Sequence, residues 1–325
     1  MSNPFFKNFG PLKISEIIKI LDIKINLKNK DFEIYDVKDL NSATKKDITF
    51  LHSKKYKDIS KSTKASYCLT TKFLKSELPS NCIALVVENV LLSTSKVTSV
   101  FYPESVNDDY DETVVSINET QYQNKVMFGK NVMIGKNVTI GMNCKIGHNT
   151  IIESNVVIGN NCSIGSNNII RNAVIQNNIK ILDNCVIGKH GFGFFPVKDK
   201  NLRYPHIGIV IIEDNCEIGC GATIDRGSMS NTVIGKNTFL DNQIHIAHNV
   251  KIGENSILAG QVGIAGSSII GNNVRIGGQA GISGHLKIGN NVEIGGGSGV
   301  IKDVPDNTKV MGYPAKNIRD FLRDN

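Results

Sequence analysis

The strongest constraint on the fold of this chain is an aliphatic residue that returns every six positions. The repeat runs from Ile134 to Ile170, slips by one residue and breaks for a loop after Ile187. It later continues without error from Ile234 to Val300. An α-helix, with about 3.6 residues per turn, cannot keep such residues on one face. The period therefore predicts a mainly β fold, a parallel β-helix in which three hexads form one triangular coil.

Asparagine occupies the fourth position of many hexads. A bend at this position favours a positive φ, which Asn tolerates better than other residues that carry a side chain. Four asparagines stand three hexads apart in the unbroken part of the repeat: Asn237, Asn255, Asn273 and Asn291. One corner of the predicted prism is therefore expected to be an asparagine ladder, with successive coils about 4.8 Å apart.

The other two corners carry little side-chain bulk. One contains residues 241–243, 259–261, 277–279 and 295–297, and the other contains 247–249, 265–267 and 283–285. Glycine at a corner can relieve backbone strain, or it can clear a groove for an extended ligand. The histidines that flank the second corner favour a groove.

An aspartate and three histidines interrupt the regular hexads. Asp241 precedes His248 by seven residues, and His285 stands on the same corner as His248, two coils or roughly 9–10 Å away. That separation is too large for both histidines to bind one metal within a chain. A carboxylate that accepts a hydrogen bond from an imidazole raises its basicity, as a general base requires. The alternative is an inert surface histidine. His245 is expected to pack or to make a polar substrate contact.

Composition restricts the compartment and the chemistry. Seven cysteines without a CxxC pair indicate neither a disulfide framework nor a structural zinc site, and they favour a reducing cytoplasm. Cys144 and Cys162 are expected to be buried core residues. No apolar run is long enough for a transmembrane span, and the first residues do not resemble a secretion signal. With 6% aromatic residues and a net charge of +7, the chain offers no stacking platform for nucleic acid. Lysines crowd the amino-terminal part, as a solvated face or a surface for an acidic partner.

Five short motifs are more specific than the hexad. They are GFGFFP (191–196), IGCGATIDRG (218–227), DNQIHIAHNV (241–250), AGQVGIAGS (259–267) and GISGHLKIG (281–289). Together they resemble the UDP-3-O-(3-hydroxyacyl)glucosamine N-acyltransferases of lipid A biosynthesis, over essentially the whole chain. The resemblance implies a hexapeptide-repeat acyltransferase with a left-handed parallel β-helix. The left hand comes from the resemblance alone, because general crossover rules favour the opposite hand.

The resemblance also implies roles for individual residues of the β-helix. His248 aligns with the general base of the family, Asp241 with the residue that orients it, and His285 with a second histidine that contacts substrate or the oxyanion. Additional substrate-binding positions are expected from the same motifs: His245, Asn249, Gly266 and Gly284. At His245 the family usually has Gln, so a polar contact there differs in this chain.

The amino-terminal part lacks the hexad. Residues 14–21 are predicted to form an amphipathic helix, and residues 65–71 and 82–89 to form buried strands of a small α/β domain. From the residues alone, Phe50 and Tyr56 are core or edge aromatics. The resemblance implies instead that they stack on the uracil of a uridine nucleotide, with Ser53 standing where the family commonly has a nucleotide-contacting Asn.

These patterns predict three domains. Residues 1–105 are the α/β uridine-nucleotide-binding domain, 106–306 the β-helical acyltransferase domain, and 307–325 a short helical segment. The apolar face of that helix would carry Ile318, Phe321 and Leu322. Relatives often have a longer helix here.

The expected reaction is transfer of a 3-hydroxyacyl group to the 2-amino group of a UDP-glucosamine lipid. The resemblance implies a donor carried on the 4′-phosphopantetheine of acyl carrier protein, no bound cofactor or metal, and a homotrimer. Three alternatives stay open: an O-acyltransferase of UDP-N-acetylglucosamine, a zinc carbonic anhydrase on the same scaffold, and a non-catalytic β-helix.

Overall fold

A computed structural model describes residues 3–27, 29–119, 121–122 and 126–312. The chain forms two compact units. The first comprises Met1–Asp109, Gly193–Ile207 and Ser228–Ser230, and the second comprises Tyr110–Phe192, Gly208–Gly227 and Asn231–Asn325. The two later segments of the first unit were not predicted from the sequence. They join it because Ile207 and Met229 contribute to its apolar core.

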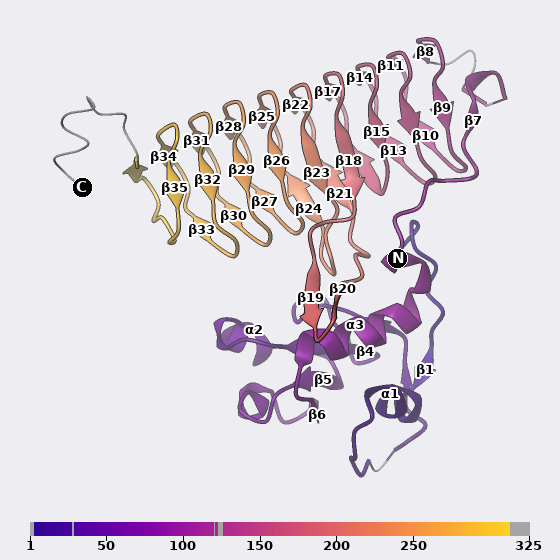
Figure 1. The fold of residues 1–325 in the computed structure, drawn as a ribbon, viewed down its shortest axis with the longest axis vertical. Helices are drawn as coiled ribbons and strands as arrows, with labels where there is room; N and C mark the ends of the chain where they lie inside the picture. Colours follow the sequence, from indigo (N-terminus) through magenta and orange to yellow (C-terminus); the bar gives the residue numbers. More distant parts are fainter. Residues whose placement is uncertain (1–2, 28, 120, 123–125, 313–325) are drawn as a thin grey trace. The chain divides into compact units, whose positions relative to one another are not determined.

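The second unit is a β-helix whose three faces are three sheets, stacked coil upon coil in Figure 1. Face 1 consists of β8 (Met127–Phe128), β11 (Lys145–Ile146), β14 (Ser163–Ile164), β17 (Lys180–Ile181), β22 (Glu217–Ile218), β25 (Phe239–Leu240), β28 (Ile257–Leu258), β31 (Arg275–Ile276), β34 (Glu293–Ile294) and β36 (Lys309–Val310). Face 2 consists of β7 (Val115–Ser116), β9 (Met133–Ile134), β12 (Ile151–Ile152), β15 (Ile169–Ile170), β18 (Val186–Lys189), β23 (Thr223–Asp225), β26 (His245–Ile246), β29 (Gly263–Ile264), β32 (Gly281–Ile282) and β35 (Gly299–Val300). Face 3 consists of β10 (Thr139–Ile140), β13 (Val157–Ile158), β16 (Ala173–Ile175), β21 (Val210–Ile212), β24 (Thr232–Ile234), β27 (Lys251–Ile252), β30 (Ile269–Ile270) and β33 (Lys287–Ile288). All neighbours within the faces are parallel except β7, which pairs antiparallel with β9; a 3₁₀ turn at Ile117–Glu119 follows β7.

The hexad places its aliphatic residue inside the prism. In β27, Ile252 is buried and pairs with Ile270 of the next coil, three hexads later, while the preceding Lys251 faces outward. Two-residue strands of this kind alternate out and in, as the period of a β-strand requires. The coil geometry predicted from the repeat is therefore confirmed. Cys144 and Cys162, predicted to be core residues, are both buried.

The corners also follow the prediction. Asn237, Asn255, Asn273 and Asn291 all adopt φ between 55° and 57°. Their amides bond from coil to coil, as from Asn273 Nδ2 to Asn291 Oδ1 at 3.0 Å. An asparagine side chain thus relieves the strained backbone and joins neighbouring coils.

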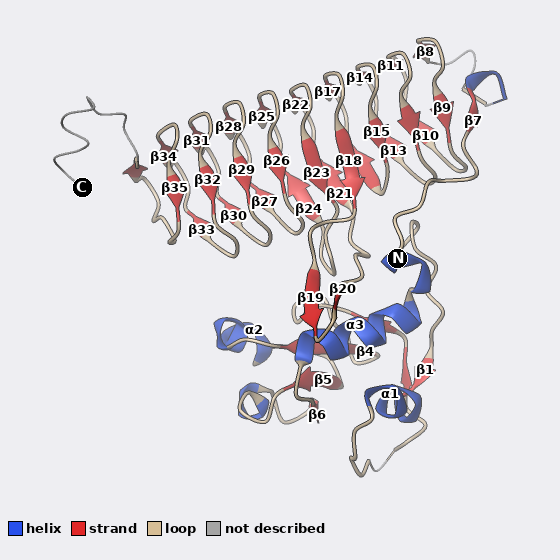
Figure 2. Ribbon diagram, in the orientation of Figure 1, coloured by secondary structure: helices blue, strands red, loops and turns tan. Residues whose placement is uncertain are grey.

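The first unit is a small α/β domain (Figure 2). Its helices are α1 (Ile14–Leu21), α2 (Lys57–Ser60) and α3 (Val90–Phe101), with 3₁₀ turns η1 (Lys54–Tyr56), η2 (Lys75–Glu77) and η3 (Pro103–Val106). Its strands are β1 (Leu12–Lys13), β2 (Glu33–Ile34), β3 (Asp36–Val37), β4 (Asp47–Leu51), β5 (Tyr67–Thr70), β6 (Ile83–Val86), β19 (Phe194–Val197) and β20 (Lys200–Arg203).

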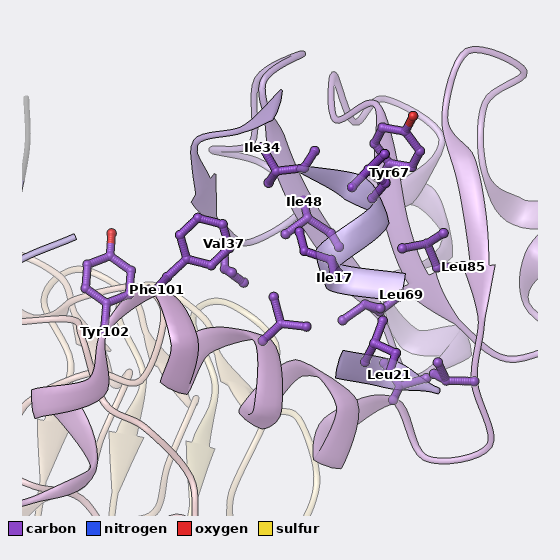
Figure 3. Close-up of a cluster of buried hydrophobic side chains, with 14 of the residues drawn as sticks. Ile17, Leu21, Ile34, Val37, Ile48, Tyr67, Leu69, Leu85, Phe101 and Tyr102 are labelled. Atoms are coloured by element: carbon purple, nitrogen blue, oxygen red, sulfur yellow. The ribbon is translucent and has the colours of Figure 1, made fainter. Parts of the chain in front are cut away.

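A four-stranded parallel sheet in the order β3-β4-β5-β6 organises this unit. Ile17 and Leu21 of α1 and Phe101 of α3 pack with Ile48 and Leu69 of the sheet in one buried cluster (Figure 3). β19 and β20 form a separate antiparallel hairpin.

The predicted carboxy-terminal helix with Ile318, Phe321 and Leu322 lies outside the described residues. Among the described residues, no helix is long and apolar enough to cross a membrane.

Candidate active site

Two corners flank face 2 of the β-helix and carry the predicted catalytic residues. The aspartate corner, defined as residues 241–243, 259–261, 277–279 and 295–297, precedes face 2. The histidine corner, defined as residues 247–249, 265–267 and 283–285, follows it. Strand β26 runs from one corner to the other, so Asp241 and His248 lie at its opposite ends. Four residue steps of extended chain, about 13 Å, separate Gln243 from Ala247.

A single chain therefore does not bring Asp241 and His248 together. Asp241 Oδ1 accepts a hydrogen bond from the backbone N–H of Asn242 at 2.8 Å. Its Oδ2 lies 3.2 Å from the position that a Cβ on Gly260 would take, so the carboxylate leans over a glycine of the next coil. A seven-residue spacing in this repeat spans one whole face, which explains the separation.

The imidazole of His248 also leans over a glycine. A Cβ on Gly266 would lie 2.7 Å from Cε1 and 2.8 Å from Nε2 of His248. His248 Nδ1 lies 2.9 Å from the side-chain oxygen of Asn249. An amide oxygen only accepts hydrogen bonds, so this contact requires Nδ1 to carry the proton. Nε2 is then the basic nitrogen, and it faces the Gly266 side of the corner.

Gly266 also leaves a backbone donor at the site. At other corners, a side chain of the next coil caps the matching backbone N–H: Asn160 accepts from Met142 N and Asn272 accepts from Glu254 N, both at 2.9 Å. The residue that would cap Gly266 is Gly284, which has no side chain. Within the described part of the chain, the N–H of Gly266 has no acceptor.

His285 completes the histidine corner. Its backbone has φ 60° and its N–H donates to Gly266 O at 3.0 Å. The structure thus gathers His248, Asn249, Gly266, Gly284 and His285 at one corner, with the two histidines two coils apart.

His245 faces outward from β26 and makes two polar contacts that were not predicted. Its Nδ1 lies 2.8 Å from Thr223 Oγ1, and its Nε2 lies 4.0 Å from Asp225 Oδ2. Burial, and then the charge of His248, lower the pKa of His245. Thr223 pairs with His245 in register, although the two are not separated by a whole number of hexads. The four extra residues between β23 and β24 hide this contact from a strict period.

The aspartate corner also borders an apolar cleft of about 490 Å³. Ile257, Gly277, Gly295, Val310 and Met311 contribute to its lining. Met311 covers Gly295 so closely that a Cβ there would lie 2.5 Å from the methionine Cε. Among the described residues, no group of three or more histidine, cysteine, aspartate or glutamate side chains could hold a metal ion.

The first unit contains the predicted aromatic pair. Phe50 lies in β4 and Tyr56 ends η1, both half-buried, and burial raises the pKa of Tyr56. Ser53, which stands between them, accepts a hydrogen bond from Lys55 N at 3.3 Å and so caps η1. The ring of His52, which sequence patterns did not single out, contacts both aromatic rings.

Two family models match this chain. Residues 137–172 and 231–266 match the model described as bacterial transferase hexapeptide (six repeats). Residues 31–100 match the model of UDP-3-O-(3-hydroxymyristoyl) glucosamine N-acyltransferase. Together with the parallel coils and their histidine corner, these matches define an acyltransferase of the hexapeptide-repeat class, and its β-helix is left-handed as predicted.

Similar proteins narrow the class. The UDP-3-O-acylglucosamine N-acyltransferase of Rickettsia prowazekii is 39% identical over 255 residues, which is 77% of this chain and 74% of that protein. That of Rickettsia rickettsii is 40% identical over 254 residues, with the same coverage. A solved UDP-N-acetylglucosamine acyltransferase from Campylobacter jejuni is 24% identical, with a TM-score of 0.49 over 55% of this chain and 68% of that one. The chain belongs to the UDP-3-O-acylglucosamine N-acyltransferase family, and it is an N-acyltransferase.

Proposed function

We propose that this protein transfers a 3-hydroxyacyl group from acyl carrier protein to the 2-amino group of UDP-3-O-(3-hydroxyacyl)glucosamine, a cytoplasmic step of lipid A biosynthesis. The single observation that carries the proposal is at the histidine corner, where the imidazole of His248 lies against Gly266, a residue whose N–H has no acceptor within the described part of the chain. A general base and an oxyanion donor are the two groups that acyl transfer to an amine requires.

In the proposed reaction, the glucosamine nitrogen attacks the thioester carbon while His248 Nε2 takes a proton from that nitrogen. The carbonyl oxygen becomes an oxyanion, which accepts a hydrogen bond from the N–H of Gly266, with His285 on the same corner. The tetrahedral intermediate collapses to the amide, the C–S bond breaks, and His248 returns the proton to the phosphopantetheine sulfur. In the single chain Nδ1 donates to the side-chain oxygen of Asn249, which leaves Nε2 unprotonated at the start of the reaction.

The active site is completed in this proposal by a neighbouring subunit of a homotrimer. Asp241 and His248 lie at opposite ends of face 2, so they are partners only if the aspartate corner of one chain meets the histidine corner of the next. A head-to-tail interface that closes after three subunits produces this meeting at every site. It also brings the apolar cleft beside Gly277 and Gly295 to the same interface, where it suits an acyl tail.

The first unit supplies the uridine contacts in this proposal. Phe50 and Tyr56 stack on the uracil, an interaction worth on the order of 1 kcal/mol beyond burial. Ser53 contributes less than the usual Asn would, because its hydroxyl already caps η1.

An acylation assay tests the reaction. The purified protein is supplied with 3-hydroxyacyl carrier proteins of graded chain length and with either UDP-3-O-(3-hydroxyacyl)glucosamine or UDP-N-acetylglucosamine. We expect an amide product from the first acceptor, equally fast in EDTA, and none from the second. Ester formation on UDP-N-acetylglucosamine alone would instead identify an O-acyltransferase.

A mixed-subunit experiment tests the shared site. His248→Ala and Asp241→Asn chains that carry different tags are co-expressed. The acyltransferase activity of trimers that carry both tags is then compared with that of the unselected random mixture. In the random mixture a site is intact when the first subunit has His248 and its neighbour has Asp241, so about one quarter of sites should be active if the interface is head-to-tail. Each variant alone should be far below this level. A mixture no more active than the two variants alone would show that both residues act within one chain.

A further inference from the structure

Three rings lie in contact at the end of β4 in the first unit. The centroids of Phe50 and His52 are 6.0 Å apart with an interplanar angle of 25°, which is a stacked arrangement. The centroids of His52 and Tyr56 are 5.3 Å apart with an angle of 47°. The imidazole therefore packs against both of the aromatic rings that the proposed function assigns to the uracil.

The local sequence explains why His52 reaches this position. Side chains alternate across a β-strand, so Phe50 and His52, two residues apart, project to the same side of the sheet. The chain then turns through η1, which Ser53 caps, and this turn returns Tyr56 to the same place. Phe50, His52 and Tyr56 are all half-buried, so the three rings share one partly desolvated surface.

The ring separations leave no room for a nucleobase beside His52. Stacked aromatic rings have centroids at least about 4.5 Å apart, so a base held between two rings needs them at least about 9 Å apart. A base therefore fits neither between Phe50 and His52, whose centroids are 6.0 Å apart, nor between His52 and Tyr56, whose centroids are 5.3 Å apart. For a base to stack on both Phe50 and Tyr56, the imidazole has to leave the position that it occupies.

We propose that His52 sets the nucleotide affinity of this protein, because its imidazole fills the uracil position until a uridine nucleotide displaces it. This inference rests on the proposed uridine site at Phe50 and Tyr56. His52 lies at the end of β4 and is only half-buried, so its side chain can rotate toward solvent, where the polar imidazole is hydrated. Each binding event then loses the ring contacts of His52 and gains those of the base.

The test is calorimetric titration of the full-length protein with uridine 5′-monophosphate. We expect His52→Ala to bind the nucleotide about three- to tenfold more tightly, because it removes ring contacts that the base must otherwise replace. His52→Phe should bind it more weakly than the wild type, because an apolar ring resists rotation into water. A general loss of local structure would weaken binding in both variants, so opposite effects of the two substitutions identify displacement.

A matched control is His148→Ala, which removes an exposed histidine from the β-helix and should leave nucleotide affinity unchanged. Unchanged or weaker binding by His52→Ala, with normal wild-type binding, would overturn the role of His52. Phe50→Ala separates this outcome from a failure of the proposed site. If Phe50→Ala binds the nucleotide as well as the wild type does, the uridine site itself is misplaced.

Discussion

Substitution of Gly266 by alanine probes the histidine corner with a single methyl group. The new Cβ would lie 2.7 Å from His248 Cε1 and 2.8 Å from Nε2, whereas non-bonded carbon atoms rest about 3.5–4.0 Å apart. The imidazole must therefore move by roughly 1 Å. The backbone can accept alanine, because Gly266 is not among the glycines with a positive φ.

The expected cost is catalytic rather than structural. A displacement of about 1 Å in a reacting group costs on the order of 10² in rate, and general base catalysis contributes about 10²–10⁴ in total. We expect kcat of Gly266→Ala to fall about 10²-fold, which corresponds to about 2.7 kcal/mol of transition-state stabilisation. The melting temperature should change by no more than about 2 °C, because the substituted position lies outside the packed interior of the coil.

Steady-state transfer from a 3-hydroxyacyl carrier protein and thermal unfolding measure the two effects. The control is Gly263→Ala in β29 of the same coil, where a Cβ would meet nothing within 4 Å. That variant should keep its kcat in the wild-type range. If Gly266→Ala keeps more than about a third of wild-type kcat with its structure intact, the position of the His248 ring over Gly266 does not matter for catalysis.

Substitutions at three other positions test separate features. Burial lowers the pKa of His245 in the folded state below its unfolded value of 6.5. As pH falls below 6.5 the unfolded state binds a proton before the folded state does, so the folded state loses stability until the pH is below the folded pKa. His245→Gln lacks this group, so its urea midpoint should fall less than that of the wild type between pH 7 and pH 5. Asn273 has φ 57°, so Asn273→Ala should lower the unfolding free energy by about 1 kcal/mol and Asn273→Gly by less. Met311 covers Gly295 in the apolar cleft, so Met311→Ala should shift the donor preference toward acyl chains about two carbons longer in a competition between carrier proteins.

The six-residue period was sufficient to predict the β-helix, because each coil depends on neighbours at a constant spacing of three hexads. It also predicted the left-handed backbone at Asn273, since the strain and the side chain that relieves it belong to the same residue. Packing between distant segments left no such signal. Ile207 lies in the core of the first unit, although a long stretch of β-helix separates it in sequence from the rest of that core.

Contacts that cross an irregularity were equally hidden. The four-residue insertion after β23 removes Thr223 from the position three hexads before His245, so their hydrogen bond escapes a strict count. His52 gave no signal because neither its spacing nor its residue type differs from that of an ordinary strand end. Its significance comes only from the two rings that it touches.

The capping pattern of the corners suggests that the glycines at positions 266 and 284 give up stability for the proposed catalysis. A corner N–H often receives a side-chain acceptor from the next coil, as Asn272 provides for Glu254. A hydrogen bond of this kind contributes about 1 kcal/mol, and within the described coils the N–H of Gly266 lacks it because Gly284 has no side chain. Gly266 itself leaves a space for the imidazole, and, in the proposed mechanism, the lack of a side chain at Gly284 leaves the Gly266 N–H as a donor for the oxyanion. A repeat selected for stability alone would place asparagine or serine at both positions. A side chain at position 266 would displace the imidazole of His248, and a side chain at position 284 would accept the hydrogen bond from the N–H of residue 266.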